Sequence, residues 1–244
     1  LIDYEAHEPG TVFANGMRLE LSDAWRLQSA VADLREERGE TAVGYKIGCV
    51  CENNQQANGL SHPVWGRLWS IEQHLNGVSL RKDNFANLAI EAEFAVSLNQ
   101  SIHPADTSDE VLVEAVAEIY PVIEFHNLVK RGTPPTGAEL IANNCIHAGV
   151  VRGQGVKVSA PAVDTDLALI FDGQTVDSWS SLQWPRDILS SVKWLAVQLD
   201  KSGKRLEEGD LILTGAFGPP IPIGDKSKVD VTSSAFGDVS ASFI

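Results

Sequence analysis

The sequence predicts an α+β protein in which mixed β-sheets roll into a barrel-like core with helices outside. Many short apolar segments of strand-like composition lie along the 244-residue chain, and turn residues separate them. Only a few segments repeat their apolar residues at helical spacing. Strands and helices do not alternate regularly, as they would in a doubly wound sheet, so we expect a rolled β core.

The chain begins with a segment that we expect to be irregular over residues 1–20, because Pro9-Gly10 and Asn15-Gly16 are turn signals. A helix is then expected to begin at Leu21, with Ser22 as its N-cap, and to end at Gly39. The apolar residues that predict its buried face are Ala24, Leu27, Val31 and Leu34.

The remaining elements are predicted in the same way from spacing and turn residues. We expect a polar loop over 52–64 and helices over 108–119 (capped by Ser108), 137–143 and 188–199. Strands are expected over 44–48, 65–69, 88–98, 147–151, 167–171, 211–214, 228–232 and 239–243. We divide the chain into an N-terminal helix and strand region (1–75) and a β-roll core (76–244).

Charge and cysteine content narrow the classes of function. The formal net charge is −14, which argues against nucleic acid and anionic membrane surfaces as partners, because both select a basic surface. No apolar run approaches the ~18 residues of a membrane span. The three cysteines are odd in number, and two of them are spaced C-x-C, which fits a reducing, cytoplasmic compartment better than a disulfide framework.

Two glutamates one residue apart are the strongest chemical signal in the chain. Glu91 and Glu93 lie in an otherwise apolar segment of period two, so both carboxylates should project from one face of a strand. Like charges this close raise each other's proton affinity unless a cation neutralises them, and Mg²⁺ prefers carboxylate oxygens. The alternative is that both side chains lie on the solvated face of an antiparallel sheet.

Glu124 is a third carboxylate that could join the pair. It is a single acid within the apolar run Tyr120–His126, and an acid in such a run is seldom fully buried unless it is paired or coordinated. Glu91, Glu93 and Glu124 would together form a tri-carboxylate site with positions left for water and substrate.

The chain resembles the fumarylacetoacetate hydrolase superfamily, and within it the 2-keto-4-pentenoate hydratase branch, from about Leu21 to the C-terminus. The segments that carry the resemblance are Gly44-Tyr45-Lys46-Ile47-Gly48, Glu91-Ala92-Glu93-Phe94, Pro121-Val122-Ile123-Glu124, Trp194-Leu195-Ala196 and Gly209–Ala216 followed by Gly218-Pro219-Pro220. The resemblance implies a fumarylacetoacetase C-terminal-type fold, a homo-oligomer of at least two chains, and Mg²⁺ or Mn²⁺ held by Glu91, Glu93 and Glu124.

The resemblance also implies a catalytic role for Lys46, although a lysine in a strand is more commonly a solvated edge residue. In the following loop, Ser61 and His62 stand where relatives carry acidic residues. His62 is a candidate proton carrier because imidazole titrates near neutrality, and a solvated loop histidine is the alternative.

Further substrate-binding candidates are Ser61, Asn144, Gly215 and Ala216. Asn144 could instead belong to a helix C-terminus, and the Gly215-Ala216 turn, whose amides could bind a carboxylate, could be only a tight turn.

The implied reaction is the metal-dependent addition of water to a 2-hydroxy-2,4-dienoate, which gives a 4-hydroxy-2-oxo acid. The same site chemistry would serve decarboxylation of a 2-oxo-dioate or hydrolytic C–C cleavage of an acylpyruvate, and fold alone does not separate them. A catalytically idle relative that only binds a 2-oxo acid is a third alternative.

Overall fold

The computed structural model describes residues 2–103, 107–158 and 162–244. Its larger sheet has the strand order β2 (Val64–Trp69), β1 (Ala42–Gly48), β10 (Leu211–Leu213), β5 (Leu88–Leu98), β6 (Val116–Asn127), β7 (His147–Arg152) and β3 (Gln73–Leu75), and β11 (Ile221–Pro222) also pairs with β5. The β1–β10 and β3–β7 pairs are parallel, whereas the other pairs are antiparallel, so the sheet is mixed.

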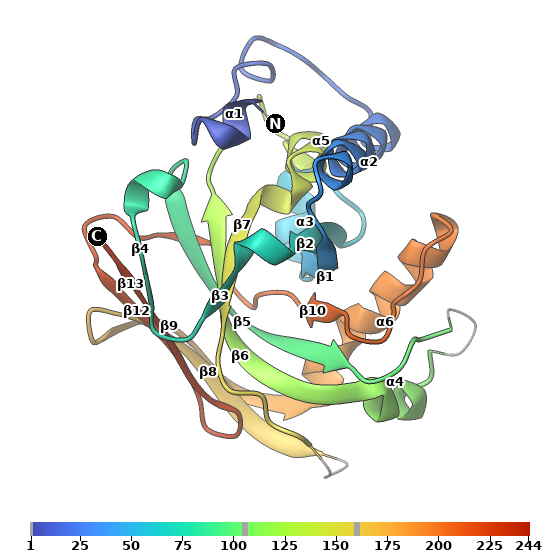
Figure 1. The fold of residues 1–244 in the computed structure, drawn as a ribbon, viewed down its shortest axis with the longest axis vertical. Helices are drawn as coiled ribbons and strands as arrows, with labels where there is room; N and C mark the ends of the chain where they lie inside the picture. Colours follow the sequence, from blue (N-terminus) through green and yellow to red (C-terminus); the bar gives the residue numbers. More distant parts are fainter. Residues whose placement is uncertain (1, 104–106, 159–161) are drawn as a thin grey trace.

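The second sheet has the order β4 (Val78–Leu80), β13 (Gly237–Phe243), β12 (Lys228–Ser233), β8 (Val163–Phe171) and β9 (Gln174–Trp184). It lies against β5 and β6, and both sheets curve, so that the strands form a partly rolled core (Figure 1). The predicted α+β class and its rolled β core are confirmed.

Helices occupy the periphery of the strands: α1 (Ile2–Glu5), α2 (Leu21–Glu37), α3 (Glu52–Asn58), α4 (Asp109–Ala115), α5 (Gly137–Ala142) and α6 (Arg186–Lys201). Short 3₁₀ turns cover Ser70–Glu72, Lys82–Asn84 and Asn144–Ile146. In Figure 1, α2 and α5 lie together at one end of the molecule, and α6 lies beyond β10. None of the helices in the described ranges is long and apolar enough to cross a membrane.

The core between the two sheets follows from the period-two pattern of β5. Ile90, Ala92, Phe94, Val96 and Leu98 are all buried in this core. Phe94 makes an edge contact with Phe236, with 5.5 Å between ring centroids, and Phe125 of β6 contacts Phe243 at 5.4 Å. The odd-numbered residues of β5 therefore point to the opposite face of the sheet, where the glutamates lie.

Residues 1–20 were expected to be irregular, but Ile2–Glu5 form the short helix α1. Three further predictions of local structure are wrong. Residues 52–58 form α3, whose C-cap is Gly59 in the left-handed region at φ 67°, a conformation that glycine adopts without strain. The helix that begins after Ser108 ends at Ala115, because the chain then enters β6 with its β-branched residues. Ser108 does cap this helix, since its side chain accepts from the amide of Val111.

The third of these further predictions concerns the buried face and cap of α2. Its N-cap is Glu20 rather than Ser22, and it makes no side-chain cap hydrogen bond. The buried residues are Ala24, Gln28, Ala32 and Arg35, whereas Leu27 and Leu34 are 40 % and 49 % exposed. Buried hydrogen bonds of Gln28 and ion pairs of Arg35 account for this face, as described below.

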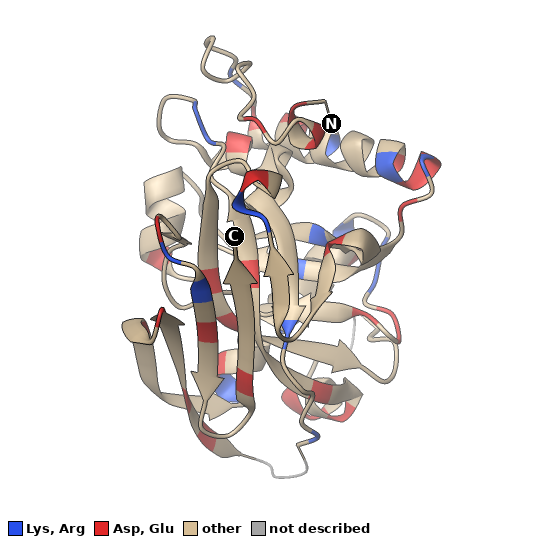
Figure 2. Cartoon of the chain, turned by 60° about the vertical axis from the view of Figure 1, so that its left-hand side comes forward, with Lys and Arg blue, Asp and Glu red and all other residues tan. Residues whose placement is uncertain are grey.

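The described elements join both predicted regions in one sheet, because β2 pairs with β1, β1 pairs with β10, and β10 pairs with β5. The division at residue 75 stays a prediction. Acidic and basic positions are interspersed along the strands, helices and loops seen in Figure 2.

Candidate functional site

Strands β5 and β6 bring three glutamates together on one face of the larger sheet. Glu91 and Glu93 are two residues apart in β5, so their side chains leave the same face. Glu124 of β6 lies directly opposite Glu91 in the antiparallel register. Glu93 and Glu124 are fully buried, and the side chain of Glu91 is 12 % exposed. The structure therefore excludes a solvated sheet face as the setting of these carboxylates.

Lys46 enters the same site from the neighbouring part of the sheet. Its partner in β10 is Leu213, whose own partner is Ala95 of β5, so these residues lie in one row across the sheet. The Lys46 ammonium is 3.2 Å from Glu124 Oε1 and is buried rather than solvated. The strand lysine singled out in the sequence thus faces the carboxylates.

Two histidines that the sequence did not assign to the site complete its polar contacts. His126 Nε2 donates to Glu91 Oε2 at 2.7 Å and lies 3.4 Å from Glu124 Oε2. His147 Nδ1 donates to Glu124 Oε1 at 2.7 Å. His126 could have been found from the sequence, because it is two residues beyond Glu124 in a strand and therefore shares its face. His147 gives no such signal, because it lies in a different strand, β7.

The burial of opposite and like charges sets the protonation of the site. Burial and the neighbouring Glu124 carboxylate raise the pKa of Glu93 well above its usual value. Burial alone would raise the pKa of Glu124 as well, but the charges of Lys46 and His126 hold it well below the usual range. Glu124 is therefore the ionised member of this pair, and Glu93 the member that holds a proton.

The same carboxylates raise the pKa values of the two basic side chains, Lys46 and His126. Burial would lower the pKa of Lys46, but Glu124 and Glu91 outweigh it and hold this pKa above its usual value. Burial would also lower the pKa of His126, and the same two carboxylates raise it to about 9. Both side chains are thus positively charged near neutral pH.

The donor set fits a hard divalent cation. The ligand atoms of Glu91, Glu124 and His126 lie within 4.8 Å of one another. Glu93 is not part of that group, and its Oε2 accepts a hydrogen bond from Gly215 N–H at 2.6 Å. However, the buried atoms Glu93 Oε1 and Glu124 Oε2 have no hydrogen-bond partner among the described residues. Buried carboxylate oxygens without partners are costly unless something coordinates them, and Mg²⁺ and Mn²⁺ favour such oxygens.

A cavity of about 180 Å³ adjoins these groups. Lys46, Glu91 and His126 line it on the strand side. Asn58 of α3 and Lys130 also line it, and Lys130 Nζ donates to Asn58 Oδ1 at 3.0 Å. The sequence did not predict a role for Asn58, because residues 52–64 were expected to form a loop. In α3, Asn58 follows Asn54 by one helical turn, and both line the cavity. The cavity thus offers a second lysine beside the carboxylate site.

The structure places the other predicted residues differently. Ser61 is exposed, and His62 lies against Trp194, with 6.1 Å between ring centroids, where it lines another cavity. The Asn144 amide bonds both backbone groups of Arg67, at 2.8 Å and 2.9 Å. The Asn144 side chain therefore holds the backbone of β2 in place.

Gly215 meets the site through its backbone. Its amide orients Glu93, and its φ of 101° lies in the region that only glycine adopts readily. Ala216 follows it and is half-buried. The Gly215-Ala216 turn was expected to bind a substrate carboxylate, and in the structure the Gly215 amide binds the side-chain carboxylate of Glu93.

Known proteins similar to this chain share its fold and much of its length. No family model matches the chain. A 2-keto-4-pentenoate hydratase from Burkholderia vietnamiensis is 26 % identical over 227 residues, which cover 90 % of this chain and 85 % of the relative. A 4-oxalocrotonate decarboxylase from a Pseudomonas species is 28 % identical over 197 residues, covering 80 % of this chain and 75 % of the relative.

Solved structures extend this likeness to the whole fold. The 4-oxalocrotonate decarboxylase of Pseudomonas putida, complexed with magnesium and adipate, superposes with a TM-score of 0.86 at 21 % identity. That match covers 100 % of this chain and 94 % of the other. A putative fumarylacetoacetate hydrolase family protein from Yersinia pestis matches with a TM-score of 0.59 at 16 % identity, over 82 % of this chain and 92 % of the other.

Proposed function

Because the chain belongs to the fumarylacetoacetate hydrolase superfamily, in its 2-keto-4-pentenoate hydratase-like branch, we propose that it is a divalent-metal-dependent hydratase, a carbon–oxygen lyase. The proposed reaction adds water to a 2-hydroxy-2,4-dienoate and gives a 4-hydroxy-2-oxo acid. The observation that carries the proposal is the group of three buried or nearly buried glutamates with Lys46 among them, beside a cavity.

Glu91, Glu93 and Glu124 would hold the cation, which is Mg²⁺ or Mn²⁺. Within the described part of the chain, Glu93 and Glu124 each have a buried oxygen without a hydrogen-bond partner, and Glu91 lines the cavity. When bound, the metal supplies Lewis-acid stabilisation of negative charge on the substrate's oxygens. His126 would orient the Glu91 carboxylate, which accepts its hydrogen bond, and His147 and Gly215 would do the same for Glu124 and Glu93.

Lys130 and Asn58 would bind the substrate in the cavity. Both line the cavity that Glu91 also lines, and a hydrogen bond from Lys130 Nζ to Asn58 Oδ1 holds them together. An ammonium group there would attract the carboxylate of a small 2-oxo or 2-hydroxy acid. Ser61, Asn144 and Ala216 stay predictions for substrate binding, and the positions of Ser61 and Asn144 do not add support.

Lys46 would deliver the proton that begins the reaction. Its ammonium is charged in this environment and is held by Glu124, whose Oε1 lies 3.2 Å from Lys46 Nζ. Protonation at C5 of the dienol, with loss of the C2 hydroxyl proton, gives a conjugated 2-oxo-3-enoate. Water then adds its oxygen to C4 and a proton to C3, which completes the balance of the hydration.

His62 stays a prediction as a second proton carrier. Its ring lies against Trp194 and its Nδ1 lies 2.8 Å from the backbone oxygen of Pro63, on a cavity that none of the three glutamates lines. The geometry therefore favours Lys46 over His62 for the acid–base role.

Decarboxylation of a 2-oxo-dioate is the second candidate function. It is favoured by the 28 % identity to a 4-oxalocrotonate decarboxylase, which slightly exceeds that to the hydratase. The same three glutamates and Lys46 would serve it, since both reactions develop charge on the oxygen at C2.

We also propose that the protein is a cytoplasmic homo-oligomer of at least two chains that acts in the catabolism of aromatic compounds. The exposed apolar residues Leu27 and Leu34 on α2 support an oligomer, because water-exposed apolar residues along one helix are typical of an interface.

The proposed function can be tested by offering the Mg²⁺-loaded protein three substrates. We expect it to bleach the ultraviolet absorbance of a 2-hydroxy-2,4-dienoate, since hydration removes the conjugation, and to lose this activity on chelation of the metal. Carbon dioxide release from an oxalocrotonate-type acid would instead establish the decarboxylase, and cleavage of an acylpyruvate would establish a hydrolase. Binding of oxalate with none of these activities would establish a catalytically idle relative.

A further inference from the structure

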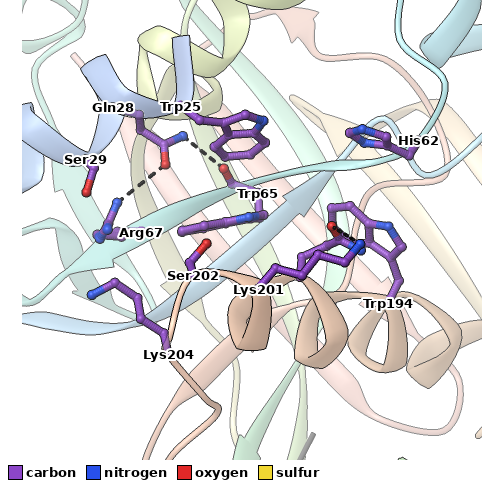
Figure 3. A pocket seen from close by; sticks show the side chains of 11 residues that line it. Trp25, Gln28, Ser29, His62, Trp65, Arg67, Trp194, Lys201, Ser202 and Lys204 are labelled. Atoms are coloured by element: carbon purple, nitrogen blue, oxygen red, sulfur yellow. Dashed lines mark hydrogen bonds between the residues drawn. The ribbon is translucent and has the colours of Figure 1, made fainter. Parts of the chain in front are cut away.

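A second cavity, of about 320 Å³, lies between α2, β2 and the C-terminal end of α6. Figure 3 shows Trp25 and Gln28 from α2 on one side, Trp65 and Arg67 on β2, and Trp194, Lys201 and Lys204 on the side of α6. Its volume is at the lower end of the range for small-molecule sites.

Lys46 of the glutamate site and the cavity-lining residues Trp65 and Arg67 lie on opposite faces of the β1–β2 pair. In the β1–β2 register, Lys46 is opposite Gly66, whereas Tyr45 is opposite Arg67 and Ile47 is opposite Trp65. Side chains directly opposite one another share a face, and successive residues alternate between faces. Arg67 and Trp65 therefore point away from the face on which Lys46 meets Glu124.

Arg67 is the feature that points to a ligand. It is only 4 % exposed, yet it forms no ion pair with any carboxylate in the described parts of the chain. Among the residues that the structure describes, its side chain makes one hydrogen bond, a long one of 3.4 Å from Nη1 to Gln28 Oε1. Asp33 and Glu36 of α2 act on it only through their more distant charge, and burial lowers its pKa. A buried guanidinium without a counterion is costly, which favours an anion beside it.

The charged residues that line the cavity are all positive. Lys201 and Lys204 add two lysines to Arg67, and no aspartate or glutamate is among the described residues that line the cavity. This local excess of positive charge stands in a chain of formal net charge −14. It therefore cannot be an accident of a generally basic surface.

Aromatic rings supply flat apolar walls beside these charges. Trp25 and Trp65 are stacked, with 5.2 Å between their centroids, and the Arg67 guanidinium lies over Trp65 at 5.3 Å. Trp194 faces the same space from α6 (Figure 3). Such walls favour a planar, unsaturated ligand body, and an arginine fork favours a carboxylate at its end.

We propose that this cavity is a second ligand site, separate from the glutamate site, for a small planar organic carboxylate. The carboxylate group would pair with Arg67 and Lys204, and the planar body would lie against the tryptophans. This proposal does not rest on the proposed function, because none of its residues belongs to the glutamate site.

Calorimetry on the Mg²⁺-loaded protein tests the proposal, with benzoate as the probe. We expect a dissociation constant of about 1 mM or tighter for benzoate, and much weaker binding of benzamide, which lacks the charge, and of acetate, which lacks the ring. Arg67→Gln should weaken benzoate binding at least about tenfold, the loss expected for a charge-assisted hydrogen bond.

Lys204→Gln provides a second variant at an exposed position, where folding is not at risk, and should weaken binding about threefold or more. Lys193→Gln is the matched control, because it removes the same charge from α6 outside the cavity, and it should bind benzoate as the wild type does. Glu93→Gln should also leave benzoate binding unchanged, which separates this cavity from the glutamate site.

Equal binding of benzoate by wild type, Arg67→Gln and Lys204→Gln would overturn the proposal, as would a complete absence of binding. Loss of binding in Glu93→Gln would overturn it too, because the probe would then occupy the glutamate site. If benzoate does not bind and Arg67→Gln lowers the mass measured by light scattering, a second copy of this chain occupies the cavity instead.

Discussion

The two oxygens of Glu93 have different surroundings, and this difference makes the residue sensitive to a bound cation. Oε2 accepts from the Gly215 amide, whereas Oε1 is buried without a partner among the described residues. Burial and the neighbouring Glu124 carboxylate raise the pKa of Glu93, so that Glu93 holds the proton of this pair while Glu124 is ionised. A cation that binds there must displace that proton.

Magnesium binding should therefore release a proton and strengthen as the pH rises. The raised pKa of Glu93 means that the metal-free site is protonated at a pH where an ordinary carboxyl is not, and protonation opposes coordination. Calorimetry in buffers of different ionisation enthalpy measures the released proton, and titrations at several pH values measure the affinity. Glu93→Gln should lose the proton release. An affinity independent of pH, with no buffer effect, would contradict this assignment.

Lys46 offers the second test at the scale of single residues. Lys46→Met keeps the length of the side chain but removes the proton donor and the partner of Glu124. We expect the rate of dienol hydration to fall about 10²–10⁴-fold, the usual effect of losing a general acid or base. His62→Ala, measured in parallel, should change the rate much less, because His62 lies on the other cavity. If His62→Ala has the larger effect, the proton donor has been misassigned.

At the scale of elements, α2 is held to the sheet by polar contacts rather than by its apolar stripe. Gln28 Nε2 donates to the backbone oxygens of Trp65 and Ile141, both at 3.0 Å. Arg35 Nη2 lies 2.7 Å from Glu72 Oε1, and the guanidinium stacks over Trp69 at 4.3 Å. A buried glutamine and a buried arginine are uncommon, so hydrophobic periodicity alone selected the wrong face.

Removing the charge of Glu72 should destabilise the protein. Glu72 accepts hydrogen bonds from Tyr4 and Arg35, and its side chain is only 5 % exposed. Glu72→Gln should lower the free energy of unfolding by about 2 kcal/mol, less than the full loss of a buried pair, because Glu40 still contacts Arg35. Urea denaturation measures this change. The exposed Glu208→Gln is the control and should shift the midpoint little; equal midpoints for both variants would refute the role of Glu72.

The sequence predicted β5 well because its period of two is unbroken over eleven residues. It did not predict α3, since Glu52–Asn58 contains a single apolar residue, Ala57, and the helix depends on its neighbours. It also placed Glu91, Glu93 and Glu124 on one site, yet missed Lys130 and Asn58. Those two line the cavity because segments far apart in the sequence fold together, and no local sequence pattern predicts such a contact.

At the scale of the whole molecule, two leucines of α2 that were expected in the core lie at the surface. Leu27 and Leu34 are exposed, and they follow one another with Val31 at helical spacing. An apolar stripe of this kind is more stable when another chain covers it.

We therefore expect light scattering at micromolar concentration to give the mass of a dimer or a larger assembly. Leu34→Gln should shift the distribution toward smaller species if the stripe forms the interface, while Val176→Gln, at another exposed apolar position, serves as a control. A wild-type mass of 26.4 kDa would be that of a single chain and would refute the prediction.

The claim that the three glutamates form the metal site of a hydratase is tested most directly by the rate of dienol bleaching as a function of Mg²⁺ concentration. Glu91→Gln is the informative variant, because Glu91 faces the cavity and is the least buried of the three. Glu118→Gln, a half-buried carboxylate elsewhere on β6, is its matched control.

We predict Mg²⁺-dependent bleaching in the wild type and in Glu118→Gln. The Glu91→Gln curve should shift to at least about 100-fold higher Mg²⁺ concentration, because replacing even a residue that only supports a metal ligand lowers metal affinity 10–100-fold. Bleaching that persists after chelation, or a Glu91→Gln curve that superposes on the wild-type curve, would contradict the account.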